Sequence, residues 1–161
     1  MKKLTALLLV AVMMFSMAAC GNTATGEDVK EPETVGEFLQ QDFVENSEGS
    51  AQEVADRLIQ NEILPFEAVT MSVEPGLLTG FDNAEITGFK EGVMFAPMMG
   101  TIPFVGYVFV LEEGVDVTGF VETLGDNANL RWNICTEAEE MVAEAEGNIV
   151  FFLMCPKNFE E

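Results

Sequence analysis

The chain has 161 residues, 48% of them hydrophobic, and its 28 acidic and seven basic side chains give a net charge of −21 at pH 7. This length suits one domain with its own hydrophobic core. The negative charge repels phosphate, which disfavours nucleic acids and direct adhesion to anionic lipid headgroups. The absence of histidine removes the commonest general base and metal ligand, together with every catalytic triad that needs one.

The first 20 residues have the parts of a secretory signal. Lys2 and Lys3 form a basic start, residues 4–17 are almost entirely apolar, and two alanines precede Cys20. The apolar run is shorter than the roughly 20 residues that a spanning helix needs. This segment resembles the signal peptide of bacterial lipoproteins, in which a small residue precedes the cysteine that is lipidated.

The resemblance implies that residues 1–19 are removed and that Cys20 receives a diacylglycerol thioether. The protein would then lie on the outer face of the cytoplasmic membrane, held through acyl chains, because two chains give a stable anchor. The alternatives are an ordinary cleaved signal with an incidental cysteine, or an uncleaved core helix. Without residues 1–19 the net charge is about −23, since five basic residues stand against all 28 acidic ones. Such acidity favours a solvated surface over a cationic partner or a calcium store.

Residues 20–49 are polar and acidic, and we expect them to form a flexible tether. Within this tether Val35, Leu39 and Phe43 recur at a spacing of four, which indicates a short helix or a segment that docks on the domain. We expect residues 50–161 to form a single domain.

Two elements are expected at the start of this domain. Ser50 and Glu53 form a capping box, and the apolar periodicity after it predicts a helix over residues 51–62, which ends before Pro65. Residues 66–73 alternate between apolar and polar side chains, which predicts a half-buried strand.

Residues 84–90 and 92–98 flank Glu91-Gly92, which predicts a hairpin with the glycine in its turn. Residues 101–111 are the longest β-rich run. The second half of that run is apolar on both faces, so we expect it to be a central strand.

Asp116 precedes apolar residues at helical spacing, which predicts a helix that ends near residues 125–127. Residues 130–134 then contain the only tryptophan, Trp132, with Arg131 beside it. Thr136 and Glu139 suggest a second capping box, so the pattern predicts a helix over residues 137–146 and a buried strand over 149–155.

Together these elements predict an α+β fold, with a mostly antiparallel sheet of four to five strands and two to three helices packed on one face. The second half of this element order is similar to small uncharacterised lipoprotein domains of Gram-positive bacteria. That similarity assigns no function.

No motif indicates catalysis, a metal or a cofactor. The serines lie outside any G-x-S-x-G elbow, and 28 acids give carboxylate pairs by chance. Two Asp-Asn stretches, at residues 82–85 and 126–129, offer calcium ligands but lack the EF-hand spacing. Thioethers and thiols could favour copper(I), but methionine more often fills cores; the residues concerned are Met94, Met98, Met99, Cys135 and Cys155.

Two further features concern binding and stability. Cys135 precedes the helix expected over residues 137–146 and Cys155 ends the following strand, so a disulfide between them is one prediction and two buried free cysteines the other.

The apolar loop of residues 96–104 could form an exposed interaction patch or a cover over the core. Its largest apolar side chains are Met98, Met99, Ile102 and Phe104.

The sequence therefore predicts a lipid-anchored, extracytoplasmic, non-catalytic module that binds a protein partner or a small ligand. A structural or assembly component of the cell envelope is the first alternative. A metal-binding or hydrolytic protein is the second.

Overall fold

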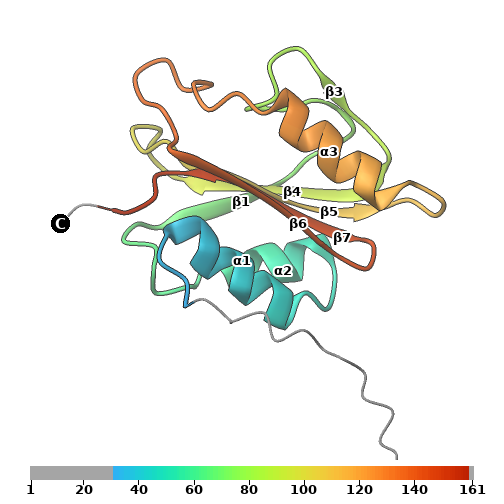
Figure 1. Cartoon of the computed structure of the whole chain (residues 1–161), viewed down its shortest axis with the longest axis horizontal. Helices are drawn as coiled ribbons and strands as arrows, with labels where there is room; N and C mark the ends of the chain where they lie inside the picture. Colours follow the sequence, from blue (N-terminus) through green and yellow to red (C-terminus); the bar gives the residue numbers. More distant parts are fainter. Residues whose placement is uncertain (1–30, 160–161) are drawn as a thin grey trace, which may run out of the picture. The chain divides into compact units, whose positions relative to one another are not determined.

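The fold is a five-stranded sheet with helices on both faces, and it is seen in a computed structural model that describes residues 31–159 (Figure 1). Cys20 and the rest of the predicted signal lie outside the described residues. The elements are α1 Val35–Asn46, α2 Ala51–Leu58, β1 Ala68–Ser72, β2 Gly76–Leu77, β3 Glu85–Ile86, β4 Phe89–Pro97, β5 Val105–Leu111, α3 Val117–Asn127, β6 Glu140–Glu146 and β7 Ile149–Cys155.

The main sheet has the strand order β1-β4-β5-β7-β6, and every neighbouring pair is antiparallel. Strands β2 and β3 form a separate antiparallel ribbon. All seven residues of both β5 and β7 are buried, which confirms that residues 105–111 form a central strand. The predicted α+β class is confirmed.

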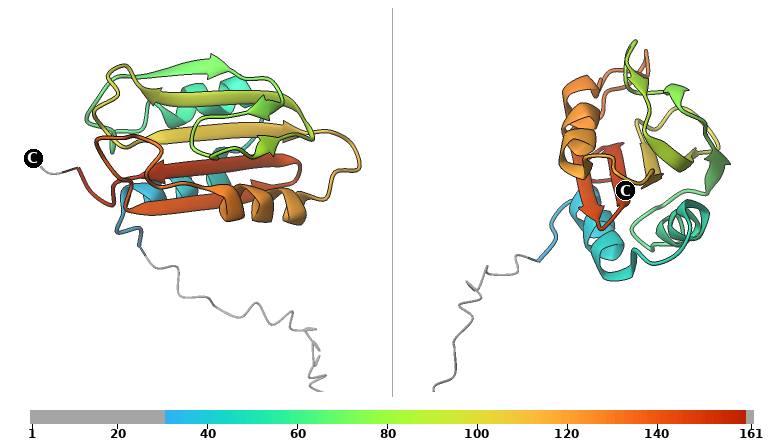
Figure 2. Two further views of the ribbon diagram at one scale, coloured as in Figure 1. Left: turned by 90° about the horizontal axis from the view of Figure 1, so that it is seen from above. Right: turned by 90° about the vertical axis from the view of Figure 1, so that its right-hand side faces the viewer.

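The core has two layers, one on each face of the sheet. Because side chains alternate along a strand, Phe151 and Leu153 of β7 pack with α1 and α2, whereas Val150 and Phe152 pack with α3 and the β2–β3 ribbon. Figures 1 and 2 show α3 on the opposite side of the sheet from α1 and α2. The expectation that all helices share one face is therefore wrong for α3.

Helix α1 confirms the short helix that the spacing of Val35, Leu39 and Phe43 indicates, and it belongs to the fold although it lies within the segment expected to be a tether. Thr34 and Glu37 form its capping box. Val35, Leu39 and Phe43 are buried, and the Phe43 ring stacks on Phe151 with centroids 5.4 Å apart. The folded part therefore begins well before residue 50.

Two predicted helices are present, the first shorter than expected and the second with the limits expected. Helix α2 follows the Ser50 capping box as expected but ends at Leu58. Helix α3 follows Asp116, whose side chain makes no capping hydrogen bond, and it continues to Asn127.

The hairpin predicted around Glu91-Gly92 is wrong, because both residues lie inside the single strand β4. Gly92 pairs with Phe109 of β5, and the register shifts between Phe89 and Glu91. A Cβ on Gly92 would lie 2.6 Å from the Phe89 ring. The glycine thus permits close packing inside a strand rather than a turn.

The helix predicted over residues 137–146 is also wrong, because this segment contains β6. All seven residues of β6 pair with β7, and the connection is Gly147-Asn148, with Gly147 at φ 61°. A glycine with positive φ suits the first position of a two-residue hairpin turn. The apolar spacing fits a helix and a strand equally, and pairing with the buried β7 selects the strand. Thr136 caps no helix, and its hydroxyl is buried without a hydrogen-bond partner within residues 31–159.

Candidate functional site

A pocket of about 310 Å³ lies where the segment before β3 meets the loop after α3. An indole ring, a guanidinium group, a carboxylate and an amide line this open pocket. The lining residues are Leu78, Thr79, Gly80, Asp82, Asn129, Arg131 and Trp132.

The first wall of the pocket, residues 78–82, is held by the core beneath it. Phe81 is fully buried, with its ring 4.7 Å from that of Phe152. The Tyr107 hydroxyl donates a hydrogen bond of 2.8 Å to the carbonyl oxygen of Thr79. Burial raises the pKa of Tyr107, so this hydroxyl remains a donor.

The backbone of this wall has two unusual residues. Gly80 has φ 96°, and a Cβ there would lie 2.5 Å from Cε of Met154. Asp82 has φ 47°, the only positive value outside glycine within residues 31–159. Asp82 is exposed. Such backbone strain persists where the surroundings impose it and is common at functional sites.

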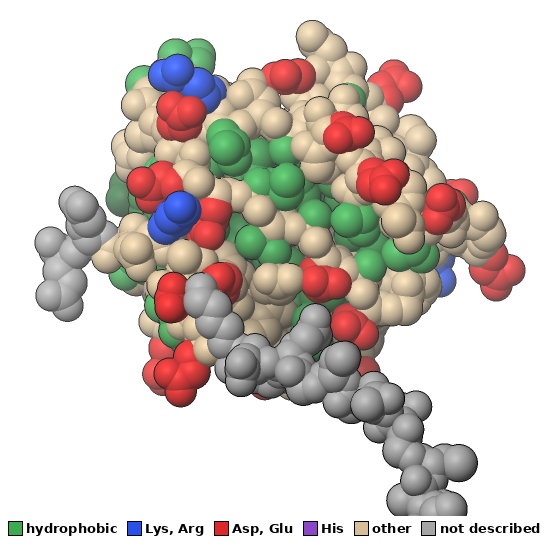
Figure 3. Space-filling view, in the orientation of Figure 1, with side chains coloured by type: hydrophobic (Ala, Val, Ile, Leu, Met, Phe, Trp, Pro, Cys, Tyr) green, Lys and Arg blue, Asp and Glu red, His purple; other side chains and the backbone are tan. Residues whose placement is uncertain are grey.

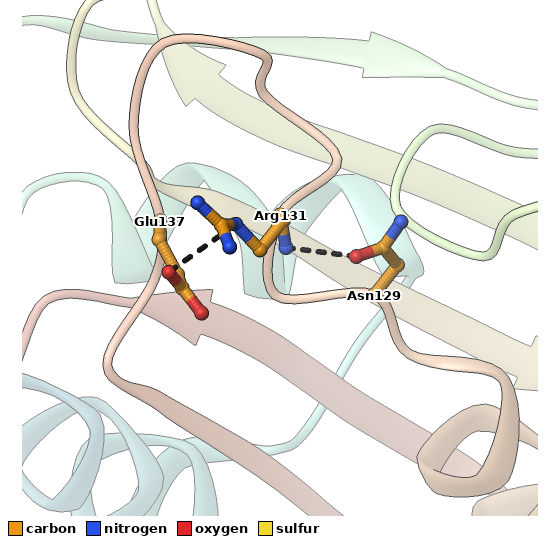
Figure 4. Close-up of polar contacts among 3 residues, drawn as sticks. All are labelled: Asn129, Arg131 and Glu137. Carbon is orange, nitrogen blue, oxygen red and sulfur yellow. Dashed lines mark hydrogen bonds and ion pairs between the residues drawn. The ribbon is translucent and has the colours of Figure 1, made fainter.

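Asn129 joins the second wall to the first. Its backbone N–H donates to the carbonyl oxygen of Gly80 at 2.8 Å, and its side-chain Nδ2 donates to Oδ1 of Asp82 at 2.5 Å. Its Oδ1 accepts from the backbone N–H of Arg131 at 2.8 Å (Figure 4). The N–H of Trp132 donates to the Asn129 carbonyl at 3.1 Å. The two walls are thus fixed to each other.

An ion pair orients the charged group of the pocket. Arg131 Nε lies 3.3 Å from Glu137 Oε2, with the two side chains 77% and 53% exposed (Figure 4). So exposed a pair contributes little to stability. Its effect is to direct the guanidinium and to balance its charge beside the pocket.

A second pocket of about 270 Å³ lies near the start of α2. The N–H of Ala51, at the first turn of this helix, already donates to Glu91 Oε2 at 3.2 Å. A carboxylate of the chain itself therefore occupies the place that an anion would take.

The predicted interaction loop is divided between surface and core. Met98 and Met99 are 67% and 76% exposed. Ile102 is half-buried, and Phe104 is buried with its ring 5.2 Å from that of Phe66. Phe104 therefore covers the core as one alternative predicted, whereas an interaction patch at the exposed Met98 and Met99 stays a prediction.

A third exposed apolar residue lies on a loop that is hydrogen-bonded to the methionine loop. Asn133 Nδ2 donates to the carbonyl oxygen of Gly100 at 2.7 Å and so ties the two loops together. Ile134, next to Asn133, is 99% exposed. We call Met98, Met99 and Ile134 the apolar tip.

The two cysteines are free thiols in the structure, and the predicted disulfide is not formed there. Cys135 is exposed in a loop, while Cys155 is buried at the end of β7. The geometry that suggested a bond required a helix after Cys135, and β6 replaces that helix. The Cys155 thiol donates to Glu140 Oε1 at 3.4 Å, and burial raises its pKa.

The two stretches considered for calcium have another role, because Asp82 of the first and Asn129 of the second meet at the pocket. Within residues 31–159, no group of three or more His, Cys, Asp or Glu side chains is arranged to hold a metal ion. In the sequence, Trp132 and Arg131 are adjacent, but no motif gives them a role. The signal that could have found this site is a lone tryptophan beside one of few basic residues.

None of the helices in the part of the chain that the structure describes is long and apolar enough to cross a bilayer.

Comparisons of the chain with models of protein families, with curated proteins and with solved structures gave no match. A fold by itself does not determine a function, which depends on the residues of its sites.

Proposed function

We propose that this protein is a lipid-anchored, extracytoplasmic module without catalytic activity, which binds a protein partner through its apolar tip. The observation that carries the proposal is the exposure of three large apolar side chains, Met98, Met99 and Ile134, on two loops joined by the Asn133–Gly100 hydrogen bond. Scattered exposed apolar residues are ordinary, but gathered ones mark interaction surfaces.

The chemistry of the partner follows from the charge around the tip. The N–H of Met98 donates to the carbonyl of Glu67, while Glu137, three residues after Ile134, is paired with Arg131. Residues 31–159 as a whole carry 24 acidic and four basic side chains. Figure 3 shows acidic side chains spread widely over one face and few basic ones. We therefore expect a partner with an apolar contact area inside a basic rim, since such complementarity steers association and excludes wrong partners.

The anchor is supported by the basic, apolar and small-residue pattern that ends at Cys20. The 14 peptide links from Cys20 to Thr34 reach at most about 50 Å. The partner is then a protein of the membrane or of the envelope close to it.

The anchor is tested by substituting Cys20→Ala in cells and following the protein by detergent-phase partitioning. The parent protein should enter the detergent phase and the variant should remain in the aqueous phase. Equal partitioning of both would refute lipidation at Cys20.

The binding surface is tested by capturing the anchored protein from membranes and identifying what comes with it by mass spectrometry. The double variant Met98→Ser, Met99→Ser should lose a stoichiometric partner yet keep the parent melting temperature, because both side chains are largely exposed. Val44→Ser, at an exposed position of α1, is the matched control and should retain the partner. Capture that is unchanged in the double variant would contradict a role for the tip.

A further inference from the structure

The geometry points to a second binding site: we propose that the pocket beside Trp132 takes a neutral saccharide ring. This site is separate from the apolar tip and goes beyond the proposed protein interaction. Its volume of about 310 Å³ lies at the lower end of the range for ligand pockets, about 300–1,000 Å³. It therefore suits one small ring rather than a long chain.

The lining matches the two kinds of surface that a sugar presents. The half-buried indole of Trp132, beside Leu78, offers a flat apolar wall for the C–H face of a pyranose ring. The carboxylate of Asp82 accepts hydrogen bonds from hydroxyl groups, while the guanidinium of Arg131 donates them in a fixed plane.

These polar groups remain available to a ligand because their structural bonds use other atoms. Asn129 bonds Oδ1 of Asp82, and Glu137 pairs with Nε of Arg131. Oδ2 of Asp82 and the terminal guanidinium nitrogens have no partner among residues 31–159 in the hydrogen bonds and ion pairs of the structure.

The charges disfavour an anionic ligand. Arg131 is balanced by Glu137, and Asp82 adds one negative charge within a chain of net charge −21. An anion meets this long-range repulsion. A neutral polyhydroxylated ring does not, and it uses both the acceptor on Asp82 and the donors on Arg131, whereas a quaternary ammonium group would use the carboxylate alone.

The pocket is formed before any ligand arrives. Phe81 anchors one wall in the core, and Asn129 joins the other wall to it through two hydrogen bonds, to Gly80 and Asp82. A fixed site avoids the ordering cost of binding. Asp82, at a positive φ, accepts the side-chain hydrogen bond of Asn129 and so belongs to this fixed arrangement. Asn129 is a positioning residue in this arrangement.

The test uses the fluorescence of Trp132, which is the only tryptophan of the full chain and so reports on the pocket alone. The protein is titrated with glucose and with N-acetylglucosamine as neutral probes. Glucose 6-phosphate is the anionic probe and choline the cationic one. We expect a saturable change in emission with at least one neutral sugar in the millimolar range, and binding of the two charged probes at least about tenfold weaker.

Variants separate this site from the apolar tip. Asp82→Asn keeps a residue that tolerates positive φ and an oxygen for Asn129, so the fold should be retained while sugar binding weakens about tenfold. The double variant Met98→Ser, Met99→Ser should bind sugar like the parent protein, so loss of the partner and loss of the sugar are distinguishable. Saturation-transfer NMR on the sugar gives a second readout that does not depend on emission.

The proposal is overturned if neither neutral sugar gives a saturable signal by either method up to about 0.1 M. It is equally overturned if Asp82→Asn binds sugar as the parent does, or if choline or glucose 6-phosphate binds more tightly than both sugars.

Discussion

Gly106 is the second residue of the central strand β5, where its missing side chain makes room for a neighbouring ring. It pairs with Phe95 of β4, and a Cβ at Gly106 would lie 2.0 Å from Cζ of that phenyl ring. Phe95 is fully buried and packs against Phe104 and Phe151. The ring therefore cannot move aside without disturbing the core layer beneath α1 and α2.

Gly106→Ala should lower the free energy of unfolding by about 3 kcal/mol, at the upper end of ordinary overpacking. Gly100→Ala is the control, because no atom lies within 4 Å of its added Cβ, and it should change stability by less than about 0.5 kcal/mol. Urea titration of both variants measures this difference. Equal midpoints would show that the Phe95 ring adapts.

The two cysteines should differ sharply in reactivity in the folded protein. Cys135 is exposed, whereas Cys155 is buried and its pKa is raised by burial and by the nearby Glu140 carboxylate. Since the thiolate is the reactive form, iodoacetamide should modify Cys135 quickly and Cys155 only after unfolding.

Peptide mass spectrometry of the native and the denatured protein measures this difference. Failure to alkylate either cysteine after denaturation without reductant, with alkylation of both once reductant is added, would instead reveal the disulfide that the sequence suggested.

At the scale of the element, α2 depends on the capping box at its start. Glu53 Oε2 accepts from the backbone N–H and the hydroxyl of Ser50, both at 2.9 Å, and the Glu53 N–H donates to that hydroxyl at 3.2 Å. The backbone hydrogen bond from Ser50 is the main reason that the pKa of Glu53 lies below 4.5. Removing the cap with Ser50→Ala should cost about 1 kcal/mol of stability.

The lowered pKa of Glu53 predicts a pH dependence. The unfolded chain binds this proton more readily than the folded one, so stabilisation by Glu53 is complete above the unfolded value of 4.5 and is lost as the pH falls through the lower folded value. The stability difference between the parent protein and Glu53→Gln should therefore be constant near neutral pH and shrink below pH 4.5. Urea midpoints of both proteins across this range measure it, and a pH-independent difference would contradict the linkage.

Local patterns predicted some elements well because the deciding interactions are local. The Ser50 box and the strict spacing after it predict α2, and the uninterrupted apolar run of residues 149–155 predicts β7. A local pattern does not decide the structure of residues 137–146. Met141, Ala143 and Ala145 alternate as a strand, while Met141, Val142 and Ala145 also fit a helix, and only the partner strand resolves the ambiguity.

At the scale of the whole molecule, charge repulsion opposes folding. Residues 31–159 carry 24 acidic and four basic side chains, and the pair of Arg131 and Glu137 is largely exposed. Net charge this far from zero keeps a protein soluble but destabilises its compact state.

Salt should therefore stabilise the protein. Raising NaCl from about 0.01 M to about 0.3 M shortens the Debye length from about 30 Å to below 8 Å, so we expect the melting temperature to rise by several degrees. Differential scanning calorimetry measures it. A fall in melting temperature would mean that favourable ion pairs outweigh the repulsion.

The sequence by itself determined the α+β class, the central position of residues 105–111, and the starts of α2 and α3, because these follow from periodicity and capping among residues close in the chain. Only the tertiary structure decided that residues 35–46 belong to the core, that α3 packs on the opposite face and that residues 140–146 form a strand. It also brought Asp82 to Asn129, 47 residues away along the chain. Each of these depends on what the sheet buries and pairs, and contacts between distant residues leave no local pattern from which to predict them.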